Sequence, residues 1–322
     1  MFEFLHTQTW YQPMTDYFTR RHLLRQTAAA VGLGVTGTSL RPCASAAEAV
    51  FHGRFAICNE TFGDWPMPRG LALAAECGYE GIEIAPFTIA PLVTDVSAEA
   101  RRQIRRQAET SGLRVVGLHW LLARTKGFHL TSPDREVRRR TADYLGALAE
   151  FCADLGGDLL VFGSPQQRDL QNGVTRQRGL QYAAEVIRQT LPVLDKSAVR
   201  LAIEPLSPRT TNFLRTASEA LELIQLVDSP RCRLILDCNA MATESTPPAD
   251  LIRQYGQHLL HFHANDPNGQ GPGFGQLDFV PIFQALRQID YSRWVSVEVF
   301  NYDPGAERLA RESIAYMKRC LD

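Results

Sequence analysis

The sequence predicts a (β/α)8 barrel, in which eight parallel strands alternate with helices around one core. Short β-rich runs alternate with amphipathic stretches at an even spacing from residue 55 onward. There are eight such runs without a long interruption, which favours a closed barrel over an open sheet. The residues after the first run, 59–65 (NETFGDW), are not the glycine-rich phosphate loop expected in an open doubly wound sheet.

The elements follow from local patterns. Three of the expected helices have recognisable ends: residues 97–111 begin with Ser97, residues 134–155 end at Gly156, and residues 216–227 begin with a Thr-x-x-Glu capping box. The expected strands span residues 55–61, 80–86, 113–121, 158–164, 199–206, 232–238, 259–265 and 293–300.

Composition supports a single globular domain. Of the 322 residues, 45% are hydrophobic and 21% are charged, which is ordinary for a chain that buries one large core. Glycine and proline are spread along the chain rather than pooled, so we expect one barrel domain over residues 50–322. The net charge of -1 gives no electrostatic support for nucleic-acid binding. A small molecule is therefore a better expectation for the binding partner than a nucleic acid. The sequence leaves open whether the protein forms a homo-oligomer.

Residues 1–47 have the features of a twin-arginine export signal. Arg20 and Arg21 precede a mildly apolar stretch over residues 27–40, and the small residues 44–47 (ASAA) suit a signal peptidase. The stretch is too short and too rich in glycine for a stable membrane span. We therefore expect export to a periplasm. The alternative is a cytoplasmic protein with an exposed N-terminal helix that happens to carry two arginines.

The leader is unusually long, so translation could start at Met14 rather than Met1. Loss of residues 1–47 would remove four arginines and two acidic residues, which changes the net charge from -1 to -3. The six cysteines beyond the leader show no CxxC spacing, and we interpret them as buried apolar residues rather than metal ligands.

Four polar residues follow one another at the ends of the last four expected strands. Glu204, Asp237, His263 and Glu298 each close a hydrophobic run. In a closed barrel the carboxyl ends of the strands surround one mouth, where these barrels carry their sites. The four side chains can therefore converge although they are far apart in the sequence.

Burying three carboxylates together without a cation would be very unfavourable, because each raises the pKa of the others and loses its hydration. A divalent ion resolves this conflict. Three oxygen ligands and one imidazole suit Mn²⁺, Mg²⁺, Co²⁺ or Zn²⁺, and the absence of a thiolate argues against a closed structural zinc site. The sequence predicts one metal ion bound by Glu204, Asp237, His263 and Glu298.

These motifs resemble the xylose isomerase-like superfamily of sugar isomerases and epimerases, notably its ketose 3-epimerases. The resemblance covers about residues 53–320 and rests on the segments 203–206 (IEPL), 236–237 (LD), 261–263 (HFH) and 297–300 (VEVF), with support from 118–122 (LHWLL) and 163–165 (GSP). It implies that the four residues are the metal ligands. It also implies that Glu204 and Glu298 act as acid and base in proton transfer through an enediolate, which gives epimerisation.

The chain departs from those epimerases at three positions that help to hold the sugar there. Thr210, Ala240 and Gly269 stand where the family carries a glutamate, a histidine and an arginine. A simple free ketose is therefore a less obvious substrate. The candidate substrate-binding residues at other strand ends and loops are His119, Glu83, Trp120, Lys126 and Arg168, and Asn265 or Asp266 could support a ligand.

The leading functional prediction is a metal-dependent isomerase or epimerase acting on a carbohydrate. The alternative is a lyase or dehydratase that uses the same proton abstraction on a keto-sugar, a 3-keto-glycoside or a keto-inositol. An endonuclease with this barrel would need a trinuclear centre with more histidines, and a sugar-binding protein without turnover would not need both glutamates.

Overall fold

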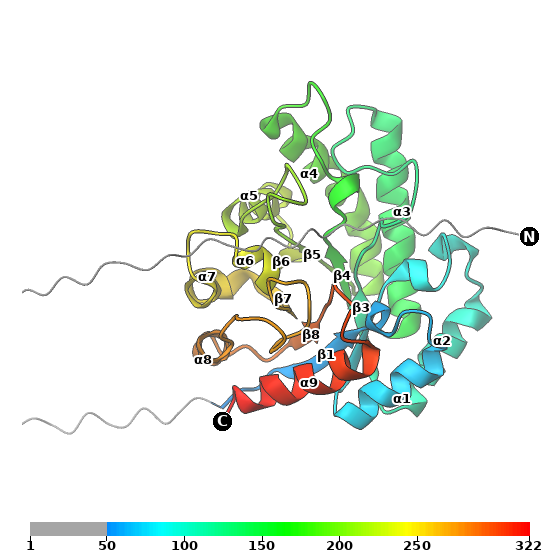
Figure 1. Cartoon of the computed structure of the whole chain (residues 1–322). Helices are drawn as coiled ribbons and strands as arrows, with labels where there is room; N and C mark the ends of the chain where they lie inside the picture. The colour runs from blue at the N-terminus through cyan, green and yellow to red at the C-terminus, as the bar shows by residue number, and fades with distance from the viewer. Residues whose placement is uncertain (1–49) are drawn as a thin grey trace, which may run out of the picture. The chain divides into compact units, whose positions relative to one another are not determined.

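The computed structural model describes residues 50–322, which form a closed barrel of parallel strands surrounded by helices (Figure 1). The strands follow the order β1 to β8, and β8 pairs with β1 to complete the barrel. The predicted (β/α)8 fold is confirmed. The leader expected over residues 1–47 lies outside the described residues.

The eight strands of the described chain match the eight expected runs. They are β1 (Arg54–Cys58), β2 (Gly81–Ile84), β3 (Arg114–Leu118), β4 (Leu159–Phe162), β5 (Arg200–Ile203), β6 (Cys232–Asp237), β7 (Leu259–Ala264) and β8 (Trp294–Val297). All eight end earlier than expected, because the apolar composition continues past the last ladder hydrogen bond into the loops. Glu204 and Glu298 therefore lie one residue beyond β5 and β8.

The helices form the outer layer (Figure 1). Their bounds are α1 (Met67–Cys77), α2 (Ala98–Thr110), α3 (Arg135–Leu155), α4 (Arg176–Ser197), α5 (Ala217–Val227), α6 (Cys238–Met241), α7 (Pro248–Tyr255), α8 (Val280–Gln288) and α9 (Ala306–Arg319). Short 3-10 turns are η1 (Asn59–Phe62), η2 (Pro86–Thr88), η3 (Val93–Asp95), η4 (Pro165–Gln167) and η5 (Gly256–His258).

The predicted helix ends are made by the expected residues. The hydroxyl of Ser97 accepts a hydrogen bond from the Ala100 amide at the start of α2, and Gly156 ends α3 in the left-handed conformation at φ 90°. At α5, Thr216 accepts from the Glu219 amide, but the Glu219 carboxylate accepts from the Arg215 amide, one residue before the cap. The second hydrogen bond of the capping box, from the Glu219 side chain back to the backbone, is therefore made one residue earlier than in the standard motif.

The barrel interior is filled by a small apolar cluster that is distinct from the layer between strands and helices. Side chains alternate along a strand, so residues two apart point to the same side. Glu204 and Asp237 lie two residues beyond Ala202 and Ile235 of this cluster, and therefore also point inward. The members of the interior cluster are Ala56, Val116, Leu159, Val161, Ala202, Ile235, Leu260 and Trp294.

Two irregularities in register adjust this pattern near the barrel mouth. The pairing of β2 with β3 shifts between Ile82 and Glu83, and the pairing of β6 with β7 shifts between Leu234 and Ile235. In the second case the partner of β6 changes from Leu259 to His261. The shift turns His261 and, two residues later, His263 toward the interior.

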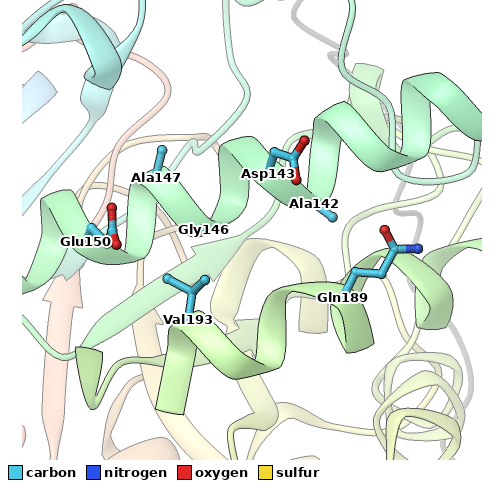
Figure 2. Close-up of a pocket in the computed structure, with 7 residues that line it drawn as sticks. All are labelled: Ala142, Asp143, Gly146, Ala147, Glu150, Gln189 and Val193. Carbon is cyan, nitrogen blue, oxygen red and sulfur yellow. The ribbon is translucent and has the colours of Figure 1, made fainter. Parts of the chain in front are cut away.

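One hollow of the described chain lies outside the barrel mouth. A hollow of about 240 Å³ between α3 and α4 is lined by residues that include Gly146, Gln189 and Val193 (Figure 2). It belongs to the outer helices and lies apart from the barrel mouth.

Among residues 50–322, no helix has the length and apolar character needed to cross a membrane.

Candidate metal centre

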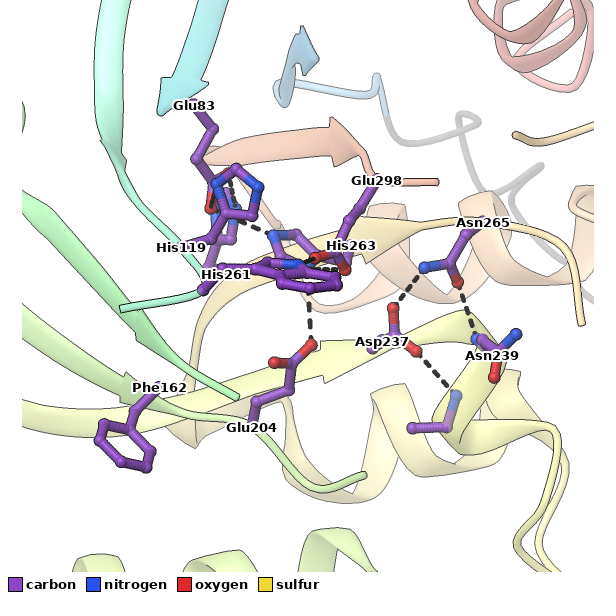
Figure 3. A network of polar contacts seen from close by, with 12 residues as sticks. Glu83, His119, Phe162, Glu204, Asp237, Asn239, His261, His263, Asn265 and Glu298 are labelled. Atoms are coloured by element: carbon purple, nitrogen blue, oxygen red, sulfur yellow. Dashed lines mark hydrogen bonds and ion pairs between the residues drawn. The ribbon is translucent and has the colours of Figure 1, made fainter. Parts of the chain in front are cut away.

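The four expected ligands converge at the mouth of the barrel (Figure 3). Glu204, Asp237, His263 and Glu298 each offer one ligand atom, and these atoms all lie within 4.8 Å of one another. None of the four residues is more than 4% exposed. The ends of β5, β6, β7 and β8 thus place three carboxylates and one imidazole around a single point.

His263 lies at the centre of the group. Its Nδ1 is 2.9 Å from Oε2 of Glu298 and 3.5 Å from Oε1 of Glu204. Although the first distance is short, neither Nδ1 of His263 nor Oε2 of Glu298 has a partner in hydrogen-bonding geometry. Two buried polar atoms that face each other without a hydrogen bond are the arrangement expected of ligands that share an ion.

Asp237 and Glu204 are held by their surroundings. The Ala240 amide donates to Oδ1 of Asp237 at 2.7 Å, and Nδ2 of Asn265 donates to Oδ2 at 2.6 Å. Beside Glu204, Gly163 has no side chain, and a Cβ there would lie 2.2 Å from Oε2 of Glu204. Gly163 therefore leaves the space that the carboxylate occupies.

Burial of the carboxylates changes their proton affinity. Burial and then the neighbouring Glu204 and Glu298 raise the pKa of Asp237 to about 8. The pKa of Glu204 is also raised, first by burial. Burial alone would raise the pKa of Glu298 as well, but the adjacent His263 outweighs it and the pKa is lowered. The site concentrates negative charge that a cation would relieve.

The donor set fits a divalent ion. Three carboxylates and one imidazole nitrogen are buried together, and the imidazole presents a free Nδ1. Oxygen ligands with one histidine suit Mn²⁺, Mg²⁺, Co²⁺ or Zn²⁺.

Behind His263 lies Glu83, at the end of β2 (Figure 3). Oε1 of Glu83 is 3.2 Å from Nε2 of His263, and its Oε2 is 2.8 Å from Nε2 of His261. A carboxylate on the far nitrogen of a ligand histidine fixes the ring and its tautomer. Glu83 is fully buried and both of its oxygens are engaged, so its contacts differ from those expected of a substrate-binding residue and orient His263 instead.

Arg168 likewise differs from its expected role. It is fully buried and donates to the carbonyl oxygens of Glu204 at 2.5 Å and of Leu214 at 3.1 Å. Burial lowers the pKa of its guanidinium to about 10. Arg168 therefore braces the backbone at the end of β5 rather than contacting a sugar.

Trp120 and His119 follow β3 at the mouth, and their expected roles as substrate contacts stay predictions. Nε1 of Trp120 donates to Oε1 of Glu298 at 2.6 Å, and the half-buried indole packs near Phe87 and Phe300. His119 is fully buried, and its Nε2 makes a hydrogen bond with Oε2 of Glu60 at 2.7 Å. Lys126 is exposed in the loop before α3 and has no hydrogen bond or ion pair with any residue of the range 50–322, so its substrate role stays a prediction.

The three positions that depart from the ketose epimerases have structural roles of their own. The Thr210 hydroxyl donates to the Ser207 carbonyl, and the Ala240 amide supports Asp237. Gly269 adopts φ 82°, a conformation that favours glycine, and its carbonyl accepts from the amides of Phe300 and Asn301.

Sequence reasoning missed the supporting residues more than the ligands. Glu60 follows β1 and His261 precedes the ligand histidine by two residues, so both were visible as polar residues at strand ends without an assigned role. Asn239 could not be identified from the sequence, because it acts on the site only indirectly: its backbone amide donates to Oδ1 of Asn265 at 2.8 Å. Asn265 supports Asp237 as considered, whereas Asp266 accepts from the amides of Gly273 and Leu277 in its own loop.

Comparison with known proteins places the chain in a family. Residues 71–320 match the family described as xylose isomerase-like TIM barrel. A probable ketose 3-epimerase from Synechocystis is 27% identical over 268 residues, which is 76% of this chain and 88% of the relative. A D-psicose 3-epimerase from Ruminiclostridium cellulolyticum is 25% identical over 70% of this chain and 75% of its own length.

Solved structures share the fold at low sequence identity. A D-psicose 3-epimerase from Clostridium cellulolyticum H10, determined with D-tagatose, has a TM-score of 0.73 and 19% identity, covering 84% of this chain and 99% of that one. A 3-keto-D-glucoside 4-epimerase from E. coli has a TM-score of 0.72 and 19% identity, with coverage of 83% and 99%. The names of the relatives support an isomerase or epimerase and give no support to the lyase alternative.

The raised pKa of Asp237 predicts how pH acts on the metal-free and the metal-loaded protein. Between about pH 4 and the folded-state pKa of about 8, the folded chain holds a proton at Asp237 that the unfolded chain releases. Stability of the EDTA-treated protein should therefore fall as pH rises through this range. Metal binding requires the ionised carboxylate, so metal affinity should rise over the same range.

Thermal melting with EDTA or Mn²⁺ at pH 5 and pH 8 checks this expectation. A 100-fold excess of Mn²⁺ over its Kd should raise the Tm by roughly 5 °C at pH 8. At pH 5 and the same Mn²⁺ concentration the rise should be smaller. An equal rise at both pH values would contradict a proton at Asp237 that competes with the metal.

The position of Glu83 predicts an effect on metal affinity without direct ligation. Glu83→Gln keeps the shape but removes the charge that orients His263, and such changes lower metal affinity by about 10- to 100-fold. Isothermal titration with Mn²⁺ measures the change. Glu80→Gln is the matched control, because Glu80 is exposed at the other end of the same strand. Unchanged affinity in Glu83→Gln would remove Glu83 from the metal centre.

Proposed function

We propose that this chain, which belongs to the xylose isomerase-like TIM barrel family, is a sugar epimerase that depends on one divalent metal ion. The metal ligands in this proposal are Glu204, Asp237, His263 and Glu298. The convergence of these four buried side chains within 4.8 Å supports the metal site. The names of the relatives, among them ketose 3-epimerases, support the reaction class.

The observation that carries the mechanism is the placement of two glutamates on different sides of one point. Glu204 follows β5 and Glu298 follows β8, with β6 and β7 between them, and both carboxylates approach Nδ1 of His263. Epimerisation requires one group to remove a proton from a carbon and another to return a proton to the opposite face. Glu204 and Glu298 are the pair that can do this.

The two glutamates differ in proton affinity. The pKa of Glu204 is raised, chiefly by burial, whereas that of Glu298 is lowered because His263 outweighs the effect of burial. Trp120 also donates to Glu298 and favours its ionised form. These shifts describe the metal-free site; with His263 bound to a metal as a neutral ligand, the Trp120 contact is the feature that still distinguishes Glu298 from Glu204. In this assignment Glu298 accepts the first proton and Glu204 supplies the second.

A divalent ion bound by these ligands would supply positive charge to a carbonyl oxygen and so acidify the adjoining C–H group. The rest of the work falls to the protein: Asn265 and the Ala240 amide orient Asp237, Glu83 orients His263, and burial keeps bulk water from the carboxylates. We propose a keto-sugar substrate, since a carbonyl beside the reacting carbon is needed for this acidity.

Solvent exchange tests the reaction. In D₂O the Mn²⁺-loaded protein should convert D-fructose, D-tagatose or a 3-keto-glucoside to an epimer that carries deuterium at the inverted carbon, as measured by NMR. Glu298→Gln should lower kcat by about 10²- to 10⁴-fold, the usual contribution of a general acid or base. Metal content is measured for the same variant, because Glu298 is also a proposed ligand.

Glu99→Gln on the exposed face of α2 is the control and should leave the rate unchanged. Loss of water or of the aglycone without an epimer would overturn the proposal in favour of a lyase. Full activity of a metal-loaded Glu298→Gln variant would overturn the proton-transfer assignment.

We further propose that residues 1–47 export the protein through the twin-arginine route, which carries folded proteins. The support is the order of Arg20-Arg21, the mildly apolar stretch and the small residues 44–47. Replacing both arginines by lysine should retain the full-length chain in the cytoplasm, as seen by cell fractionation. Periplasmic protein with an intact residue 1 or 14 would rule out cleavage.

A further inference from the structure

Glu60 is a buried carboxylate beside the metal centre to which the proposed reaction assigns no role. It lies in η1, directly after β1, on the side of the mouth opposite to Glu204, which follows β5, and it is 6% exposed. The position is fixed by the fold, because the carboxyl end of each strand points into the mouth.

One oxygen of Glu60 is held and the other is not. Nε2 of His119 donates to Oε2 at 2.7 Å, whereas the buried Oε1 has no hydrogen-bond partner among the described residues. Leaving a buried acceptor unpaired is costly, and for a charged group the cost is larger. Such an oxygen is expected to accept a hydrogen bond from a donor outside the chain, which is a water molecule or a bound ligand.

The Glu60 carboxylate lies beside the proposed base. Glu60, His119 and Glu298 each offer a ligand-type atom, and these atoms are within 4.8 Å of one another. Glu298 is the proposed base, so a group bonded to Glu60 would be close to the reacting carbon. Donors near that carbon in a sugar are its hydroxyl groups.

A second metal ion fits this group less well. Nε2 of His119 is engaged by Glu60, and Oε1 of Glu298 is engaged by the Trp120 indole at 2.6 Å. Oε2 of Glu298 faces His263 in the first site. Nδ1 of His119 has no hydrogen-bond partner in the described part of the chain, but it lies 3.8 Å from Oε1 of Glu83. An ion held at Glu60 through Nε2 of His119 or Oε1 of Glu298 would displace the contacts above, whereas a hydroxyl needs only the free oxygen.

We propose that Glu60 is a substrate-binding residue whose Oε1 accepts a hydrogen bond from a sugar hydroxyl next to the reacting carbon. His119 is a positioning residue, because it is fully buried and holds the other oxygen of the same carboxylate. The inference rests on the proposed function for the identity of the ligand as a polyhydroxylated keto-sugar. It sets a specificity: the substrate carries a free hydroxyl on the side of the mouth formed by β1 and β3.

Binding of sugar to the Mn²⁺-loaded protein tests this contact with a readout other than the rate of epimerisation. Isothermal titration with D-tagatose or a 3-keto-glucoside gives a Kd for the wild type, Glu60→Gln and Glu60→Ala. Both variants should bind the sugar about 10- to 100-fold more weakly, the usual effect of losing a hydrogen bond to a charged group. His119→Asn should show a smaller loss, since the carboxylate remains but is no longer held.

Metal affinity and a surface control separate this role from a structural one. Glu60→Gln should retain the wild-type Kd for Mn²⁺ and the wild-type Tm in Mn²⁺. Glu80→Gln, which is exposed at the far end of β2, should bind both ligands as the wild type does. A Glu60→Gln variant that loses Mn²⁺ affinity in step with sugar affinity would overturn the proposal and make Glu60 part of the metal centre.

A set of monodeoxy sugars identifies the hydroxyl. For the wild type, one deoxy analogue should bind about 10-fold more weakly than the parent sugar. For Glu60→Ala, the same analogue and the parent sugar should bind equally well. If every analogue shows the same loss in both proteins, Glu60 does not contact a hydroxyl. Sugar binding without any epimer formation would refute the proposed reaction and leave the Glu60 contact standing.

Discussion

The burial of negative charge at the barrel mouth is the constraint on which the rest of the site depends. Five carboxylates reach the mouth from β1, β2, β5, β6 and β8, and each must find a cation, a donor or a proton. The carboxylates are those of Glu60, Glu83, Glu204, Asp237 and Glu298. Glu204 and Glu298 face Nδ1 of His263, Asp237 accepts from Asn265 and the Ala240 amide, and Glu60 and Glu83 contact histidines.

His263 connects several of these carboxylates. Its Nδ1 faces Glu204 and Glu298, whereas its Nε2 rests on Glu83, which also holds His261. Glu298 in turn accepts from Trp120, which lines the mouth with Phe87 and Phe300. Metal binding, proton transfer and sugar recognition are therefore proposed for residues that lie close together at one barrel mouth.

The proposed metal ligands and the proposed sugar contact come from different strands of the barrel. The strands β5 to β8 carry the proposed ligands, and the loops after β1 and β3 carry the pair Glu60 and His119. Thr210, Ala240 and Gly269 serve their own loops, so in the proposed function the polar contact to sugar comes from the other side of the mouth. This division allows recognition to vary while the metal centre is retained.

The sequence alone determined the eight strands and the residues at their ends, since alternation and helix-end signals are local properties. It identified the four proposed ligands because the carboxyl ends of parallel strands share one mouth. It could not place Glu83 behind His263 or Arg168 against the Glu204 carbonyl, because both depend on register shifts and loop paths. Only the tertiary structure decided which oxygens are engaged and that Oε1 of Glu60 remains free, since hydrogen bonds between distant strands leave no trace in spacing.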